Sequence, residues 1–247
     1  MPVFFLPLHC ISPPTVTVTG ELLTHLRDSL RIEVGETIMA GDGESHRYRV
    51  EITAITKQSL TGHVVDVIPQ PPQRAPSLIL GQALLKGEKM DWVIQKTTEL
   101  GVRTIIPVQS RQSIVQLKAD RVEAQTARWQ RIALEAAQQS EQWRVPAIAS
   151  PLSLSSGAIQ VSSYSLALIL TERRDRSMTL SRIELPTSPE TSILVLVGPE
   201  GGWTQEEVAG AEKMGCLPIT LGPKILRAET AAMVAIGILQ HRLGELG

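Results

Sequence analysis

Three apolar runs in the C-terminal half of the chain each finish in a loop, and this arrangement constrains the fold more than any other feature. The runs lie at residues 166–170, 193–197 and 216–221. Short runs of leucine and β-branched residues, with helical patterns between them, are typical of strands in a buried parallel sheet. Ligands bind beyond the carboxyl ends of such strands. We therefore expect the three loops to meet at one pocket.

The second and third loops are rich in glycine and proline. They have the sequences GPEGGW at residues 198–203 and GPKILR at residues 222–227. Glycine reaches positive φ without strain and lets the backbone approach a ligand closely. A P-loop would place lysine, serine or threonine where Pro199 and Glu200 stand. Glu200 therefore favours a cationic or hydroxyl-rich ligand, such as a sulfonium or a ribose; the alternative is an ordinary turn with Glu200 in solvent.

Arg227 stands immediately before the last predicted helix, which begins at about Ala228. A cation at a helix N-terminus opposes the helix dipole, so this placement favours a role in binding a phosphate or a developing negative charge. A surface salt bridge is the alternative. Glu229 complements the dipole, which is a sufficient structural reason for its presence.

A proline-rich segment at residues 69–76 separates two different patterns. Before it, short alternating segments with glycine turns predict strands, with one helix at residues 21–31. These patterns predict a small β-barrel-like domain in residues 1–72. After it, strand and helix patterns alternate, which predicts an α/β domain with a parallel sheet in residues 73–247.

Capping signals mark the helices of the second part. Asp120 and Thr204 each precede a glutamate by three residues, which predicts the N-caps of two helices. Gly101 and Gly215 are expected to end helices.

Composition excludes several classes of protein. The chain has 247 residues, of which 43% are hydrophobic and 20% charged, as in globular domains rather than disordered chains. Its two cysteines have no paired spacing, which argues against a disulfide framework or a metal site. It has no apolar run of the roughly 18 residues that a membrane span needs. We therefore expect a cytoplasmic protein without a metal. Because the net charge is −1, binding to a polyanion would depend on local clusters of basic residues.

Several segments together carry a resemblance to a known family. They are LVGPEGGWT at residues 196–204, LGPKILRAETA at 221–231, KGEKM at 86–90 and QKTTELGV at 95–102. In combination they resemble the 16S ribosomal RNA uridine-N3 methyltransferase family, which belongs to the SPOUT class of knotted methyltransferases. The resemblance spans nearly the whole chain.

The resemblance implies the fold, the cofactor and the partners. We expect a PUA-like RNA-binding β-barrel in residues 1–72. We also expect a SPOUT methyltransferase domain with a parallel sheet and a C-terminal trefoil knot in residues 73–247. The cofactor would be S-adenosylmethionine, the substrate 16S ribosomal RNA in the small ribosomal subunit, and the assembly a homodimer. Carried onto this chain, the cofactor-binding residues would be Leu170, Thr171, Gly198, Pro199, Glu200, Gly201, Gly202, Leu221, Gly222, Ile225, Leu226, Arg227 and Thr230.

Transfer to uridine N3 requires loss of the imide proton and stabilisation of the resulting anion. We expect Arg227 to stabilise that anion, with Glu172 and Glu229 as candidate proton acceptors. Candidate RNA-binding residues are Arg31, Lys86, Lys89, Lys96 and Arg111. For the three lysines, the alternative is an ordinary solvated face of an amphipathic helix.

Three other functions compete with this interpretation. The first is a related knotted methyltransferase that acts on another RNA, such as transfer RNA. The second is a non-catalytic RNA-binding module with the same fold. The third is a dinucleotide-dependent oxidoreductase, which the lack of a G-x-G-x-x-G motif after the first strand of the α/β part disfavours.

Overall fold

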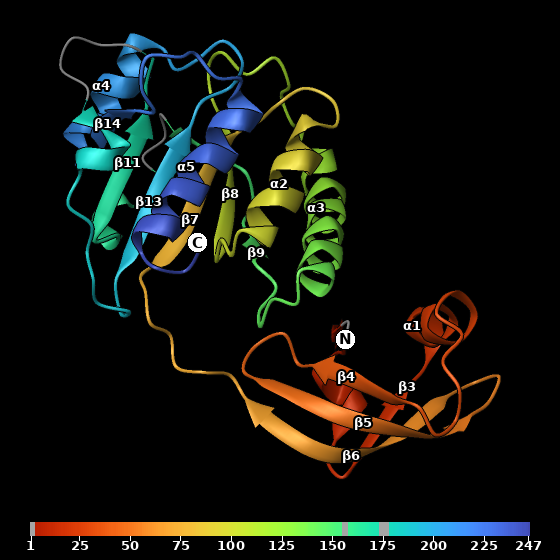
Figure 1. Ribbon diagram of the computed structural model, residues 1–247. Coiled ribbons are helices and arrows are strands. Elements are labelled where there is room, and N and C mark those ends of the chain that lie inside the picture. Colours follow the sequence, from red (N-terminus) through yellow and green to blue (C-terminus); the bar gives the residue numbers. More distant parts are fainter. Residues whose placement is uncertain (1–2, 155–157, 173–177) are drawn as a thin grey trace. The chain divides into compact units, whose positions relative to one another are not determined.

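The computed structural model describes residues 3–154, 158–172 and 178–247 (Figure 1). Contacts between residues group the chain into two compact units. The N-terminal unit consists of Met1–Pro72 and Ala137–Val145, and the C-terminal unit consists of Gln73–Ala136 and Pro146–Gly247.

The N-terminal unit is built on a curled sheet with the strand order β1-β4-β5-β6-β3-β2. Its strands are β1 (Val3–Phe5), β2 (Ile11–Ser12), β3 (Thr15–Val18), β4 (Thr37–Gly41), β5 (His46–Ile55) and β6 (Leu60–Pro69). β1 pairs with β4 in parallel and the other neighbours are antiparallel. Alternate residues such as Val16, Val50 and Leu60 are fully buried in a single core. One apolar face therefore holds this unit together.

The helix expected at residues 21–31 is shorter and less regular than its pattern suggested. α1 (Gly20–Thr24) passes into one π-helical turn at His25–Ser29. Arg31 then adopts a φ of 54°, a left-handed conformation that ends the helical segment. Buried Leu26 keeps this segment on the core.

A short segment of the second half of the chain belongs to the N-terminal unit. Within Ala137–Val145, the Glu141 carbonyl accepts a 2.6 Å hydrogen bond from the Arg47 guanidinium. The same guanidinium lies 3.9 Å from the centre of the Trp143 ring, a cation–π contact. The Arg144 guanidinium donates to the Gln70 side chain at 2.8 Å. These contacts explain why this segment groups with β5 rather than with its neighbours in sequence.

The C-terminal unit contains a sheet in which every pairing between described strands is parallel. Its order is β10-β8-β7-β13-β11-β14-β12, with β9 beside β8. The strands are β7 (Ser77–Ala83), β8 (Thr104–Gln109), β9 (Ala147–Ile148), β10 (Leu152–Ser153), β11 (Leu166–Leu170), β12 (Met178–Thr179), β13 (Ser192–Val197) and β14 (Leu217–Thr220). The three predicted apolar strands are therefore neighbours, with β11 between β13 and β14. Their carboxyl ends lie at one edge of the sheet.

The helices of this unit are α2 (Lys89–Glu99), α3 (Ala119–Gln139), α4 (Gln205–Lys213) and α5 (Ala228–Arg242). Gly101 and Gly215 follow α2 and α4 with φ values of 79° and 102°, as their positions predicted. The predicted capping box of α4 is present, with Thr204 and Glu207 bonded reciprocally. Asp120 is not an N-cap, because α3 begins one residue earlier.

Helices cover both faces of the sheet. Val208 and Ala211 of α4 pack in one core with Leu194 and Leu196 of β13. Because side chains alternate along a strand, Ile193 and Val195 point to the opposite face. α5 lies over β13 and β7, and α2 packs beside α5 (Figure 1). Both α4 and α5 start at the edge where β13 and β14 end.

Candidate functional site

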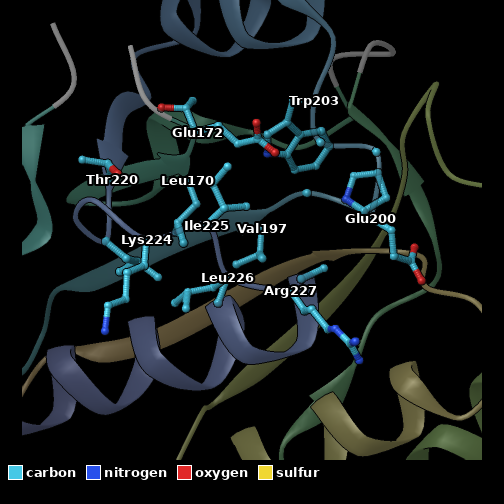
Figure 2. A pocket seen from close by; sticks show the side chains of 18 of the residues that line it. Leu170, Glu172, Val197, Glu200, Trp203, Thr220, Lys224, Ile225, Leu226 and Arg227 are labelled. Atoms are coloured by element: carbon cyan, nitrogen blue, oxygen red, sulfur yellow. The ribbon is translucent and has the colours of Figure 1, made fainter. Parts of the chain in front are cut away.

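The main cavity of the C-terminal unit lies at the carboxyl ends of β11, β13 and β14 (Figure 2). Its volume is about 760 Å³, within the range of about 300–1,000 Å³ that is usual for small-molecule sites. The loops that follow the three strands all contribute to its wall. The strand order thus brings together segments that are distant in sequence.

Nearly all of the expected cofactor-binding residues line this pocket. They are Leu170, Thr171, Gly198, Pro199, Glu200, Gly201, Gly202, Leu221, Gly222, Ile225, Leu226 and Arg227. Thr230, in the first turn of α5, is not among the lining residues. Sequence reasoning missed others that are, notably Lys89, Trp203, Lys224 and Ala231. Trp203 directly follows the glycine loop, and that position was the available signal.

Glycine is required at several points of the pocket wall. Gly202 and Gly222 have φ values of 76° and 116°, which side chains with a Cβ rarely adopt. A Cβ on Gly198 would lie 3.2 Å from Nε1 of Trp203. A Cβ on Gly201 would lie 2.7 Å from Oε1 of Gln112. A side chain at these positions would be strained or would crowd Trp203 or Gln112, so glycine allows the close packing of the loops that form the pocket wall.

The Glu200 carboxylate has hydrogen-bond partners in the protein, in contrast to the alternative that its loop is an ordinary turn with Glu200 in solvent. Its Oε1 accepts a 2.9 Å hydrogen bond from Nζ of Lys89 and a 3.4 Å bond from the Lys86 backbone N–H. Burial favours a raised pKa for Glu200, but the hydrogen bonds from Lys89 and from backbone N–H groups hold the pKa below its usual value. The hydrogen bond to Glu200 likewise raises the pKa of Lys89. Both groups are charged at neutral pH.

Arg227 is the N-cap residue of α5, with extended backbone at φ −63° and ψ 152°. Its side chain is exposed and extends to the same side of the pocket as Glu200 (Figure 2). Among the described residues, no acidic side chain forms a salt bridge with it. The surface salt bridge proposed as the alternative role for Arg227 is therefore not seen in this part of the chain.

The two candidate proton acceptors occupy different environments. Glu172 is exposed and lines the pocket, and its Oε1 lies 3.9 Å from the position that a Cβ on Gly202 would take. Glu229 is only 8% exposed and does not line the pocket. Its Oε2 is buried without a hydrogen-bond partner among the described residues. Of the two carboxylates, only Glu172 lies where a pocket ligand would meet it.

Glu207 supports the pocket from behind, a role beyond the cap that the sequence suggested. Its buried carboxylate accepts the Thr204 N–H at 2.9 Å, the Arg111 N–H at 2.9 Å and the Ser110 hydroxyl at 3.3 Å. These bonds tie the loop after β8 to the start of α4. The same loop places Gln112 against Gly201. Glu207 therefore links the start of α4, which follows the glycine loop, to the loop after β8.

The expected RNA-binding residues are divided between the two units. Arg31 is exposed in the N-terminal unit, and Lys86 and Arg111 are exposed in the C-terminal unit. Lys96 forms an ion pair with Glu99 at 2.8 Å. Lys89 lines the pocket and forms an ion pair with Glu200 at 2.9 Å, and its side chain remains 37% exposed.

Neither a metal cluster nor a membrane span was found in the part of the chain that the structure describes. There, no group of three or more histidine, cysteine, aspartate or glutamate residues is arranged to hold a metal ion. No helix in the same part is both long and apolar enough to cross a membrane.

Comparison with known families defines the class of protein. The model of an RNA methyltransferase domain matches residues 72–240, and that of an RNA methyltransferase PUA domain matches residues 18–65. The fold and the pocket at the strand ends are thus those of an RNA methyltransferase with an N-terminal PUA domain.

Individual relatives narrow the class. The chain is 28% identical to ribosomal RNA small subunit methyltransferase E of Bacillus subtilis, over 93% of this chain and 91% of the relative. The crystal structure of a protein of that name from Neisseria gonorrhoeae, bound to S-adenosyl methionine, is similar with a TM-score of 0.85, 31% identity and 98% of each chain covered. A methyltransferase from Legionella pneumophila, in complex with the bound cofactor SAM, has a TM-score of 0.85, 28% identity and 97% of each chain covered. The chain belongs to the ribosomal RNA small subunit methyltransferase E family.

Proposed function

We propose that this protein transfers a methyl group from S-adenosylmethionine to N3 of a uridine in small-subunit ribosomal RNA. The observation that carries the proposal is the pocket in which the loops after β11, β13 and β14 meet. Membership of the family and the cofactor present in the Neisseria relative support the same conclusion. The uridine and its N3 atom come from the resemblance of the loop sequences to the family.

The pocket walls fit a nucleoside that carries a sulfonium. Gly198, Gly201 and Gly202 leave backbone exposed for a flat base, and Leu170 and Leu226 supply apolar surface. When bound, S-adenosylmethionine supplies a methyl group on a positively charged sulfur, a good leaving group. The protein then has to align the uridine with that methyl group and to stabilise the uridine as an anion.

Arg227 and Glu172 have complementary tasks in this scheme. The Arg227 guanidinium stabilises negative charge on the uracil oxygens as the N3 proton leaves. Glu172 accepts that proton, directly or through water, because it lines the pocket and, among the described residues, forms no ion pair of the kind that Glu200 forms with Lys89. The bond from N3 to the methyl carbon forms as the bond from carbon to sulfur breaks.

The RNA must present its target base unpaired, because N3 lies on the Watson–Crick edge. The N-terminal PUA-type unit supplies RNA binding in this proposal through exposed Arg31. Lys86 and Arg111, which are exposed in the C-terminal unit, add cations that contact phosphates. The proposal also includes a homodimer, a trefoil knot at the three pocket loops and a cytoplasmic location, where ribosomal subunits are assembled.

A labelled-methyl transfer assay tests the proposal. The purified protein is incubated with tritiated S-adenosylmethionine and small ribosomal subunits that lack the modification, and the RNA is digested to nucleosides. We expect label in 3-methyluridine and none in bulk transfer RNA tested in parallel. Label in transfer RNA alone would indicate the alternative function, that of a related knotted methyltransferase whose substrate is transfer RNA. Calorimetric binding of the cofactor without any transfer would indicate a non-catalytic module.

A further inference from the structure

One side of the pocket carries two cations that come from separate elements. Lys89 is the first residue of α2, and Arg227 is the residue immediately before α5. Both line the cavity, and α2 packs against α5. Their charges interact, since Arg227 opposes the protonation of Lys89. Two cations that face the same cavity attract an anionic ligand group more strongly than either does alone.

Glu200 only partly neutralises this pair of cations. Its carboxylate holds Lys89 at 2.9 Å and also accepts the Lys86 backbone N–H, so Lys89 is fixed in direction. An ammonium has three N–H donors, and the described residues provide an acceptor for one of them. Arg227 has no salt-bridge partner in the same part of the chain. Donors therefore remain available to a ligand on both cations.

We propose that Lys89 and Arg227 together form the subsite that binds an anionic group of the target nucleotide, with Glu200 as the residue that positions Lys89. The inference rests on the proposed function and adds a second cation to it. The anionic group is either the deprotonated uracil or the adjoining phosphate, since both present negatively charged oxygen atoms that accept hydrogen bonds. Glu200 is thus a support for the substrate side of the pocket, rather than a carboxylate reserved for the cofactor.

The charges around Lys89 are consistent with such a role. Glu200 and Glu229 favour its protonation, and Arg227 opposes it. The ammonium is therefore charged at the pH at which the uracil must lose its proton. A cation within about 4–6 Å of an acidic group lowers the pKa of that group by about 1–3 units. Lys89 would lower the pKa of the uracil N3–H group in this way. Without that effect, a carboxylate such as Glu172 could remove the N3 proton only with difficulty.

The experiment compares Lys89→Gln, Lys89→Arg and Lys213→Gln with the unaltered protein. Lys213 is the control, because it is an exposed lysine at the end of α4 that does not line the pocket. Three quantities are measured: the Kd for S-adenosylmethionine by calorimetry, kcat/KM against pH on small subunits, and the salt dependence of RNA binding with S-adenosylhomocysteine bound.

For Lys89→Gln we expect a cofactor Kd within about twofold of the original and a loss of about tenfold or more in kcat/KM at pH 7. If the anion is the uracil, the part of the kcat/KM profile that rises with pH moves to higher pH. If the anion is the phosphate, a plot of the logarithm of the RNA association constant against the logarithm of the salt concentration becomes less steep by about 0.7–0.9. Lys89→Arg retains most of the activity, and Lys213→Gln leaves the pH profile and the salt slope unchanged.

Two results would overturn the inference. One is a Lys89→Gln protein that binds the cofactor at least tenfold more weakly, while its pH profile of kcat/KM and its salt dependence of RNA binding are unchanged. Lys89 would then only hold the glycine loop in place for the cofactor. The other is a Lys89→Gln protein that is unchanged in all three measurements. Failure of the unaltered protein to methylate small subunits is a different outcome, which contradicts the proposed function and is seen before any variant is compared.

Discussion

At the scale of single residues, Arg227 is the clearest departure from what local stability favours. It places a cation at the start of α5, where the helix dipole disfavours it, and no described acidic residue forms a salt bridge with it. Gly202 and Gly222 adopt left-handed backbone at the pocket wall, which glycine reaches without strain and other residues rarely adopt. Both features were visible in the sequence, as a cation before a helix and as glycines in the loops after two strands.

Arg227→Ala is expected to reduce kcat on small subunits by about 10²-fold, because removing one donor to a developing anion typically costs about 10²–10³-fold. Single-turnover methyl transfer at saturating cofactor measures it. Arg121→Ala, which removes an exposed arginine of α3, is the control and should leave kcat within about twofold. Equal losses in the two variants would mean that Arg227 contributes only general charge.

The same substitution at two glycines should have opposite effects. Gly202→Ala forces a Cβ into a φ of 76° and should lower the free energy of unfolding by about 1 kcal/mol. Gly210→Ala lies inside α4 with open space around the new methyl group, so it should raise that free energy by about 0.5–1 kcal/mol. Urea unfolding measures both. A stabilised Gly202→Ala protein would show that the loop does not require its left-handed residue.

At the scale of elements, local patterns predicted what local interactions determine. The capping box at Thr204, the helix ends at Gly101 and Gly215, and the three apolar strands are all set by nearby residues. The sequence offered no comparable signal that Lys89 would meet Glu200 or that Glu207 would bind the loop after β8, because those contacts join distant segments. Arg47 and Trp143 are a further example, in the N-terminal unit.

Glu207→Gln tests whether the start of α4 and the loop after β8 are held together as one unit. The amide can accept fewer of the three hydrogen bonds in this buried position, so we expect a loss of about 1–3 kcal/mol in the free energy of unfolding. Urea unfolding gives this value. A matched Glu206→Gln protein changes an exposed neighbour in the same turn and should differ from the original by less than about 0.5 kcal/mol.

The link between α2 and the glycine loop should depend on pH. The pKa of Glu200 is lowered in the folded protein, so its contribution to stability is present above the unfolded value of 4.5 and is lost as pH falls through the folded pKa. The difference in Tm between the original protein and Glu200→Gln should therefore be largest near neutral pH and shrink below pH 4.5. A difference that stays constant across this range would show that the ion pair does not support the loop.

At the scale of the whole molecule, the chain consists of two units with different folds. The fold class of each followed from periodicity, and the methyltransferase family from the loop sequences. Contacts assign Ala137–Val145 to the N-terminal unit, although this segment lies far along the chain. The arrangement leaves the pocket entirely within the C-terminal unit, so cofactor binding is expected to be a property of that unit.

The most direct test is a crystal structure of the protein soaked with S-adenosylmethionine. We expect the cofactor to lie in the cavity bounded by β11, β13 and β14, in contact with Leu170, Gly202 and Leu226, with its methyl group open to the side that carries Lys89 and Arg227. A cofactor bound at any other place, or one whose methyl group faces away from both cations, would contradict this expectation.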